Sequence, residues 1–137
     1  MNKAVYLAGP MEGVSREAMT GWRIKFIAEA SRHGIICLDP TRRVEYHQEA
    51  GLDYARFVFT KDLQDIDKSA VVFVDARRGS GRGTGTSMEA MYAWMNKKPI
   101  IVWADPGDFR HPFYESMQTV RVESLEDGIT STASFFL

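Results

Sequence analysis

Short apolar runs alternate with amphipathic stretches along the 137-residue chain. The runs are hydrophobic at nearly every position, not at every second one, which is typical of strands that are buried on both faces of a sheet. They predict four strands and a fifth, weaker edge strand, in the segments Ala4–Ala8, Ile35–Leu38, Ala70–Val74, Pro99–Ala104 and Thr119–Val122.

The stretches between these runs show helical spacing. Trp22, Phe26 and Ala30 recur every four residues, and Gly34 follows as a helix terminator. We expect helices over 15–32, 54–68 and Thr86–Lys98, with a helical turn at 112–117 and a loop or short helix over the polar residues 41–53. In the third helix we expect the side chains of Met88, Met91, Tyr92 and Met95 to point inward.

Strands that alternate with helices predict an α/β fold, a doubly wound parallel sheet of about five strands with helices on both faces. The length fits one domain over residues 1–137, and we see no repeat or linker. Ligands of such folds bind outside the carboxyl ends of the strands. The loops 9–14, 75–87 and 104–111 are therefore the expected place of a site.

Composition removes several classes of function. The 17 basic and 18 acidic side chains give a formal net charge of −1, which argues against binding of nucleic acid polymers. No apolar run approaches the about 18 residues of a membrane span, and the N-terminal residues do not resemble a signal peptide. The single cysteine, Cys37, is expected to pack as a small core residue, in keeping with a cytoplasmic location.

Four glycines alternate at 79, 81, 83 and 85, and they fit none of three common motifs. A dinucleotide fingerprint would need glycine where Thr84 stands, a P-loop would need a lysine before its last Ser or Thr, and a nucleophile elbow would need G-x-S-x-G. A glycine-rich turn that leads into a helix remains. Its backbone N–H groups can face a phosphate or sugar hydroxyls.

Two carboxylates are candidates for catalysis, and each has a structural alternative. Thr86 and Glu89 match a capping box, with Thr86 as N-cap and Glu89 at N3. Asp62 falls at the boundary of a solvated helix face. As a pair, Glu89 and Asp62 would suit glycosidic chemistry, in which one group attacks the anomeric carbon and the other carries a proton.

Other polar and aromatic residues leave alternatives open. Arg77, Arg78 and Arg82 form a solvated basic edge or meet a phosphate. Tyr6 packs in the core or orients a catalytic carboxylate. The three histidines show no metal-ligand spacing, so we expect neither a metal nor a cofactor.

Several separated motifs together resemble the nucleoside 2-deoxyribosyltransferase superfamily. In chain order they are Tyr6-Leu7-Ala8-Gly9-Pro10-Met11, Trp22, Asp39-Pro40, Asp62-Leu63-x-x-Ile66, Gly85-Thr86-Ser87-Met88-Glu89-Ala90-Met91-Tyr92-Ala93, Lys98-Pro99-Ile100 and His111-Pro112-Phe113. The resemblance extends over about residues 3–117 and implies a flavodoxin-like sheet.

The resemblance also implies a catalytic mechanism. By position, Glu89 matches the nucleophile that attacks C1′ of a 2′-deoxynucleoside, Asp62 the acid that protonates the leaving base, and Tyr6 the residue that positions the nucleophile. Transfer of the sugar to a second base would follow. Gly9, Pro10 and Met11 match the loop that borders the base. The candidates to hold the sugar or its phosphate are Arg82, Gly83, Thr84, Gly85 and Ser87.

One departure leaves the substrate open. Many of these transferases carry an Asp where this chain has Gly83, and relatives that hydrolyse nucleoside 5′-monophosphates also lack it. The alternatives are therefore deoxyribosyl transfer, hydrolysis of a monophosphate, and a non-catalytic nucleotide-binding module. The resemblance further implies a homo-oligomer whose sites are completed by a neighbouring subunit, with Ser116 and Gln118 as candidates.

Overall fold

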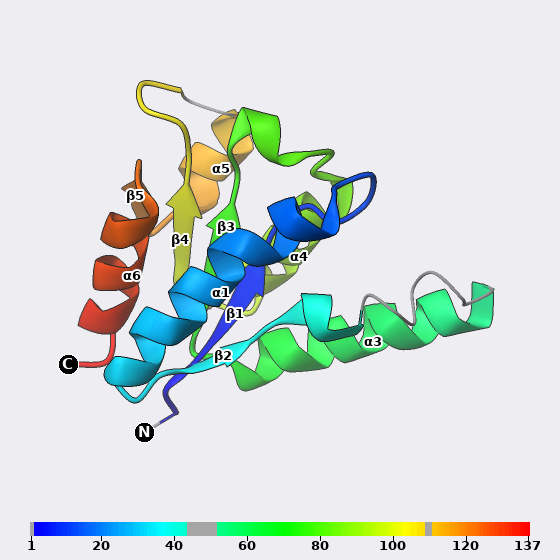
Figure 1. Cartoon of the computed structure of the whole chain (residues 1–137), viewed down its shortest axis with the longest axis horizontal. Helices are drawn as coiled ribbons and strands as arrows, with labels where there is room; N and C mark the ends of the chain where they lie inside the picture. Colours follow the sequence, from blue (N-terminus) through cyan, green and yellow to red (C-terminus); the bar gives the residue numbers. More distant parts are fainter. Residues whose placement is uncertain (1, 44–51, 109–110) are drawn as a thin grey trace.

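Five parallel strands form one sheet in the computed structural model, which describes residues 2–43, 52–108 and 111–137. The strands are β1 (Ala4–Ala8), β2 (Ile36–Leu38), β3 (Val71–Asp75), β4 (Ile100–Trp103) and β5 (Val120–Val122). Their order across the sheet is β2-β1-β3-β4-β5 (Figure 1). The predicted parallel sheet is confirmed, and its order is that of flavodoxin-like folds.

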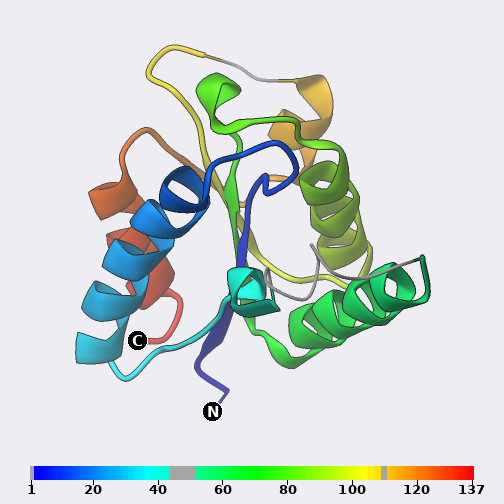
Figure 2. The same ribbon diagram turned by 45° about the vertical axis from the view of Figure 1, so that its right-hand side comes forward.

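Helices cover both faces of the sheet (Figure 2). On one face lie α1 (Arg16–Arg32) and α6 (Leu125–Ser134); on the other lie α3 (Leu52–Lys68), α4 (Thr84–Met95) and α5 (Pro112–Met117). Short 3-10 turns, η1 (Pro40–Arg43) and η2 (Arg78–Ser80), follow β2 and β3. The predicted helices over 15–32, 54–68 and 112–117 are confirmed, and most of the predicted loop or short helix over 41–53 lies outside the described residues.

Side chains along each strand alternate between two hydrophobic clusters, because a strand projects successive residues to opposite faces. Val5 and Leu7 pack toward α1 and α6, in a cluster where the Phe26 and Phe73 rings lie 4.8 Å apart. Tyr6 and Ala8 pack toward α3, α4 and α5. The alternation therefore fixes which helical layer each residue of β1 meets.

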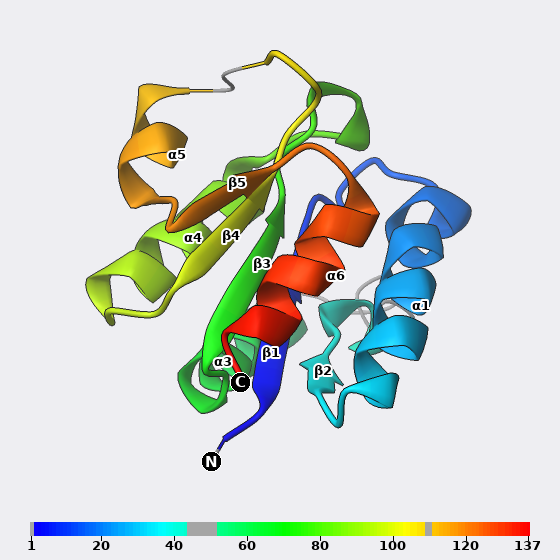
Figure 3. The same ribbon diagram turned by 90° about the vertical axis from the view of Figure 1, so that its left-hand side faces the viewer.

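The loops that follow β1 and β3 meet at the carboxyl end of the sheet, where the winding reverses direction. Gly81 makes this contact possible: its φ is +131°, and a Cβ there would lie 2.6 Å from Val14 and 3.0 Å from Pro10. Both chain ends lie toward the opposite end of the sheet (Figure 3). The two loops and the start of α4 thus form one edge of the molecule.

One prediction for α4 is wrong. Met88, Met91 and Met95 do not point into the core: their exposed fractions are 61%, 37% and 69%. The core contacts of this helix come from small residues, Ala90 and Ala93, which let it lie close to the sheet. The methionines are left on its outer face, whereas Tyr92 packs partly buried against the core, as predicted.

Cys37 is partly buried against the α1 side of the core, as expected. Burial raises the pKa of its thiol to about 12, so the thiol stays protonated and unreactive at neutral pH. Within the described residues, no helix is long and apolar enough to cross a membrane.

Candidate active site

A cavity of about 1090 Å³ opens where the loop after β1 meets α3 and α4. Its wall comes from three segments, and its lining is more apolar than polar. The lining residues are Gly9–Val14 and Met19, then Phe59, Asp62 and Leu63, then Arg82, Thr84–Glu89, Met91, Tyr92 and Met95. Two of the three loops predicted to hold a site, 9–14 and 75–87, therefore meet in one cavity.

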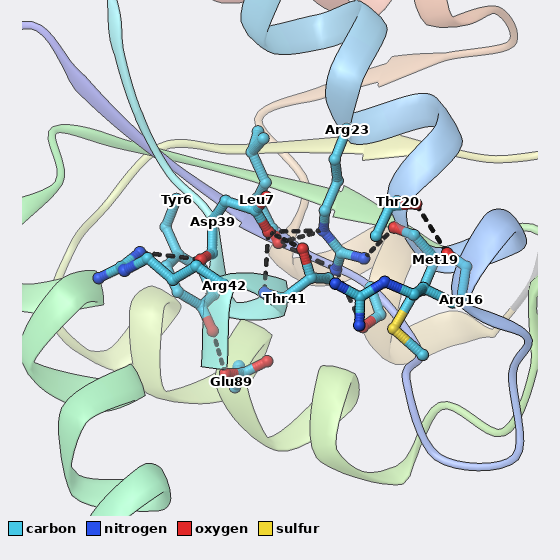
Figure 4. Close-up of polar contacts among 11 residues, drawn as sticks. Tyr6, Leu7, Arg16, Met19, Thr20, Arg23, Asp39, Thr41, Arg42 and Glu89 are labelled. Atoms are coloured by element: carbon cyan, nitrogen blue, oxygen red, sulfur yellow. Dashed lines mark hydrogen bonds and ion pairs between the residues drawn. The ribbon is translucent and has the colours of Figure 1, made fainter. Parts of the chain in front are cut away.

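At this cavity, Glu89 is bound by a residue 83 positions away in the chain. The Tyr6 hydroxyl donates a hydrogen bond of 2.5 Å to Glu89 Oε2 (Figure 4). Tyr6 is fully buried in β1 and faces α4 because of the alternation along the strand. Tyr6 and Glu89, which the sequence pairs only through the family resemblance, are thus in direct contact.

Burial raises the pKa of Glu89 from its usual 4.5 to about 7. The hydrogen bond from Tyr6 and the charge of Arg23 oppose this shift, whereas the nearby carboxylate of Asp62 adds to it. Burial also raises the pKa of Tyr6 well above 10, so its phenol keeps the proton that it donates. A carboxyl group that titrates near pH 7 can act as a base, an acid or a nucleophile under neutral conditions.

Asp62 also lines this cavity, from α3. The residue is 8% exposed, so the solvated helix face is not its environment. Its charge is among the causes that raise the pKa of Glu89. The structure therefore brings the predicted pair of carboxylates into one site.

The capping-box prediction for α4 is wrong. The helix begins two residues earlier than expected, with Gly83 as its N-cap, so Thr86 is not the cap. The side chain of Glu89 bonds to Tyr6 and not to the start of its own helix. Gly83 gives the start of α4 no side-chain cap, and the first turn holds no acidic residue, so among the described residues these first amides are accessible to water or a ligand.

Only one of the three arginines after β3 lines the cavity. The guanidinium of Arg77 donates two hydrogen bonds to Asp75 and stacks on the Trp103 ring, and Arg78 pairs with Asp108. Arg82 lies at the cavity, exposed, with its guanidinium 4.0 Å from Glu12. An arginine cluster around a phosphate is therefore not present, and Arg82 alone remains as a candidate.

The other predicted substrate residues divide into two groups. Gly9, Pro10, Met11, Thr84, Gly85 and Ser87 line the cavity, and Gly83 adjoins it as the N-cap of α4. Ser87 shares a 3.0 Å hydrogen bond with the hydroxyl of Tyr114 from α5. Ser116 and Gln118 lie elsewhere, around a second cavity of about 560 Å³ that shares Met95 with the first.

Sequence reasoning missed several residues at or behind this cavity. Phe59 at its wall was not singled out, and Met88 was expected to point into the core. Arg23, which lies behind the loop after β1, falls outside the apolar spacing of the first helix and was not a candidate, yet it is fully buried. Its direct neighbour in sequence, Trp22, was the available signal, because a charge beside a core residue often lies at the edge of the buried face.

Among the described residues, no group of three or more His, Cys, Asp or Glu side chains could hold a metal ion. The chemistry available at this site is that of a buried carboxyl group, Asp62, a partly buried one, Glu89, and a tyrosine at the switch point of a parallel sheet. These features define a flavodoxin-like α/β protein with a carboxylate-based site.

A family model described as nucleoside 2-deoxyribosyltransferase matches residues 5–127. The chain belongs to this family. No curated protein sequence matches it.

Solved structures resemble this fold at low sequence identity. The 2-deoxyribosyltransferase of Bacillus psychrosaccharolyticus is 20% identical, with a TM-score of 0.75 over 90% of this chain and 88% of the other. The 2-desoxiribosyltransferase of Leishmania mexicana is 16% identical, with a TM-score of 0.75 over 98% and 99%. The CMP N-glycosidase of Clostridium botulinum is 13% identical, with a TM-score of 0.64 over 98% and 100%. At these identities, the likeness shows the shared fold.

The Tyr6–Glu89 hydrogen bond can be tested without a substrate. In Tyr6→Phe we expect the pKa of Glu89 to rise by about one unit above its value near 7, because the bond favours the ionised carboxylate. A ¹³C NMR titration of the Glu89 side-chain carboxyl measures this. Tyr92→Phe is the matched control, since that hydroxyl bonds Asp67 instead. An unchanged Glu89 pKa in Tyr6→Phe would contradict this geometry.

Proposed function

We propose that this protein transfers 2-deoxyribose from one nucleobase to another through a covalent intermediate on Glu89. The observation that carries the proposal is the contact between Glu89 and the buried Tyr6 hydroxyl, in a cavity that also holds Asp62. Membership of the nucleoside 2-deoxyribosyltransferase family supports it. So does the pKa of Glu89 near 7, which leaves a large share of the carboxyl groups ionised at neutral pH.

In the proposed reaction, a Glu89 carboxylate oxygen attacks C1′ and forms an ester bond as the bond between C1′ and the base nitrogen breaks. Asp62 gives a proton to the departing base. The bond from Tyr6 to Oε2 holds the carboxylate and leaves the other oxygen to attack. An acceptor base then attacks C1′, Glu89 leaves, and Asp62 recovers a proton. Two inversions give retention at C1′, and each step is easier than a single direct displacement.

Substitution of Glu89 separates a catalytic role from a structural one. We expect Glu89→Gln to lower the rate of deoxyadenosine formation from deoxyinosine and adenine about 10³-fold or more. We also expect mass spectrometry of acid-quenched wild-type protein to detect a deoxyribosyl adduct on Glu89. The adduct should be absent in Glu89→Gln.

Glu89→Gln should lower the reaction rate but raise the free energy of unfolding. The folded-state pKa of Glu89 is raised, so stability is lost as the pH rises from about 4.5 through about 7. Relative to wild type, Glu89→Gln should therefore gain up to about 3 kcal/mol between pH 4.5 and pH 8. Urea unfolding measures this, with Glu126→Gln on the exposed face of α6 as control.

If neither a new nucleoside nor a free base appears with any donor, a non-catalytic binding module is the better description of this protein.

A second candidate function is hydrolysis of a 2′-deoxynucleoside 5′-monophosphate. The observation that favours it is the start of α4, where Gly83 supplies no capping side chain and Arg82 stands beside the cavity. Free amides and the positive end of a helix dipole attract a phosphate. The CMP N-glycosidase with the same fold supports this alternative.

Adding a carboxylate at Gly83 distinguishes the two substrates. Aspartate and asparagine both cap a helix well, so Gly83→Asp and Gly83→Asn differ chiefly in charge. If the substrate is a monophosphate, Gly83→Asp should raise its KM about tenfold or more relative to Gly83→Asn, through repulsion of the phosphate. Base release from nucleosides should be equal in the two variants. Equal KM values for the monophosphate would exclude a phosphate site at this helix start.

We further propose that a second copy of the chain covers the open side of the cavity. Met88, Met95 and Phe59 line it with exposed fractions of 56% to 69%, and Trp94 lies beside them at 50%. The cavity volume exceeds the about 300–1,000 Å³ of most small-ligand sites. A covering subunit would bury this apolar surface and keep water from the deoxyribosyl ester. It could also bring Ser116 and Gln118 toward a neighbouring site.

Sedimentation equilibrium tests this interface. We expect wild-type protein to be a dimer or larger at micromolar concentration and Met95→Lys to dissociate, because a buried charge would oppose association. Ile24→Lys is the control: Ile24 is 64% exposed, but on α1. A monomeric wild type, or equal dissociation of both variants, would refute an interface at α4.

A further inference from the structure

Arg23 is the largest fully buried side chain of the described residues, and it lies behind the proposed site. It comes from α1, on the opposite side of β1 from Glu89 (Figure 4). A buried guanidinium is costly unless its N–H groups are bonded. Three backbone carbonyls accept from Arg23: those of Leu7 (3.1 Å from Nη2 and 3.3 Å from Nε), Gly9 (3.2 Å from Nη2) and Met19 (2.6 Å from Nη1).

The carbonyl of Leu7 needs this donor because β2 ends early. Tyr6 pairs with Leu38, and the Lys3 carbonyl accepts from the amide of Ile36. Continued in this register, the ladder would bring residue 40 to the Leu7 carbonyl. That residue is Pro40, which has no N–H, and the chain turns there into η1. Arg23 therefore takes the place of a strand neighbour for the last part of β1.

The loop after β1 rests directly on Arg23. A Cβ on Gly9 would lie 3.1 Å from Arg23 Nη2 and 3.0 Å from the Trp22 ring, so this glycine allows close contact. Gly9, Pro10 and Met11 then form one wall of the cavity. The position of this wall follows from the position of the guanidinium.

Three carboxylates, those of Asp39, Asp75 and Glu89, act on the charge of Arg23. Asp39 Oδ1 lies 3.6 Å from Nε and keeps its hydrogen bonds to the amide and hydroxyl of Thr41. Around Glu89, the interacting groups are Tyr6 from β1, Asp62 from α3 and Arg23 from α1. Asp62 raises the pKa of Glu89, whereas Tyr6 and Arg23 lower it.

We propose that Arg23, from the opposite face of the sheet, is a positioning residue of the Glu89 site. It holds the Leu7 and Gly9 carbonyls in place of a strand, and thereby the wall that meets the base, and its charge favours the ionised form of Glu89. The inference rests on the proposed function for its effect on catalysis, but both of its physical parts can be measured without turnover.

Two substitutions separate the hydrogen bonds from the charge. Arg23→Met removes both. We expect the Glu89 pKa, followed by ¹³C NMR, to rise by about one unit, and the KM for the deoxynucleoside donor to rise about tenfold. Arg23→Lys keeps the charge but replaces three spread nitrogens by one, so we expect it to lose part of the bonds to Leu7, Gly9 and Met19. Its Glu89 pKa should stay near the wild-type value, while KM rises and the amides of residues 11–13 exchange hydrogen faster.

Asp39→Asn gives a shift of the opposite sign. It removes the anion that balances Arg23 but keeps an oxygen for Thr41, so the Glu89 pKa should fall by about half a unit. This variant and Arg23→Lys carry the test if Arg23→Met does not fold. Phe26→Leu, at a fully buried position of the same helix, is the control for general destabilisation and should change neither the Glu89 pKa nor KM.

The proposal is overturned if the Glu89 pKa does not move in Arg23→Met or Asp39→Asn. It is also overturned if Phe26→Leu reproduces the pKa shift or the faster exchange of residues 11–13. Loss of the proposed function is a separate result: wild-type protein would then release no base from any donor. In that case the NMR titrations and hydrogen exchange still decide the role of Arg23.

Discussion

The structure depends on a parallel sheet that is buried on both faces. Each strand therefore packs against helices on both faces, and adjacent residues of β1 belong to different hydrophobic clusters. Tyr6 meets Glu89 in one layer, while the carbonyl of the next residue, Leu7, meets Arg23 from the other. The site is thus supported from both sides of a single strand.

The geometry at the end of β1 follows from the same constraint. A loop that opens a cavity must leave the sheet, and its carbonyls then lose their strand partners. The buried guanidinium supplies donors at the point where Pro40 cannot. Gly9 lets the backbone lie close to Arg23, and Gly81 lets the loop after β3 lie close to the loop after β1.

The sequence predicts those parts of the fold that local patterns control. The apolar strands and the ends of α1, where Ser15 accepts a bond from the Ala18 amide and Gly34 has a φ of +70°, follow known local rules. No helix was predicted over the segment that forms α6, which contains Gly128 near its start. The structure gives the reason for that glycine: a Cβ there would lie 2.5 Å from the Phe73 ring.

The candidate site shows the same division. Thr86 and Glu89 have the spacing of a capping box, but Tyr6 binds Glu89 from the far end of the chain. No local sequence pattern predicts that contact; only the family resemblance implies it. Arg23 illustrates the limit of pattern reasoning, because its environment depends on where β2 stops and not on the residues beside it in α1.

The methionines of α4 make one wall of the cavity adaptable. Met88, Met91 and Met95 stand on the outer face of α4, along one side of the cavity. Methionine is unbranched and polarisable, and its thioether packs well against aromatic rings. A wall of this kind reshapes itself around flat heterocycles of different size at little energetic cost, whereas branched side chains would select one shape. Under the proposed function, the base would meet this adaptable wall as well as the firmer wall of Gly9, Pro10 and Met11, which rests on Arg23.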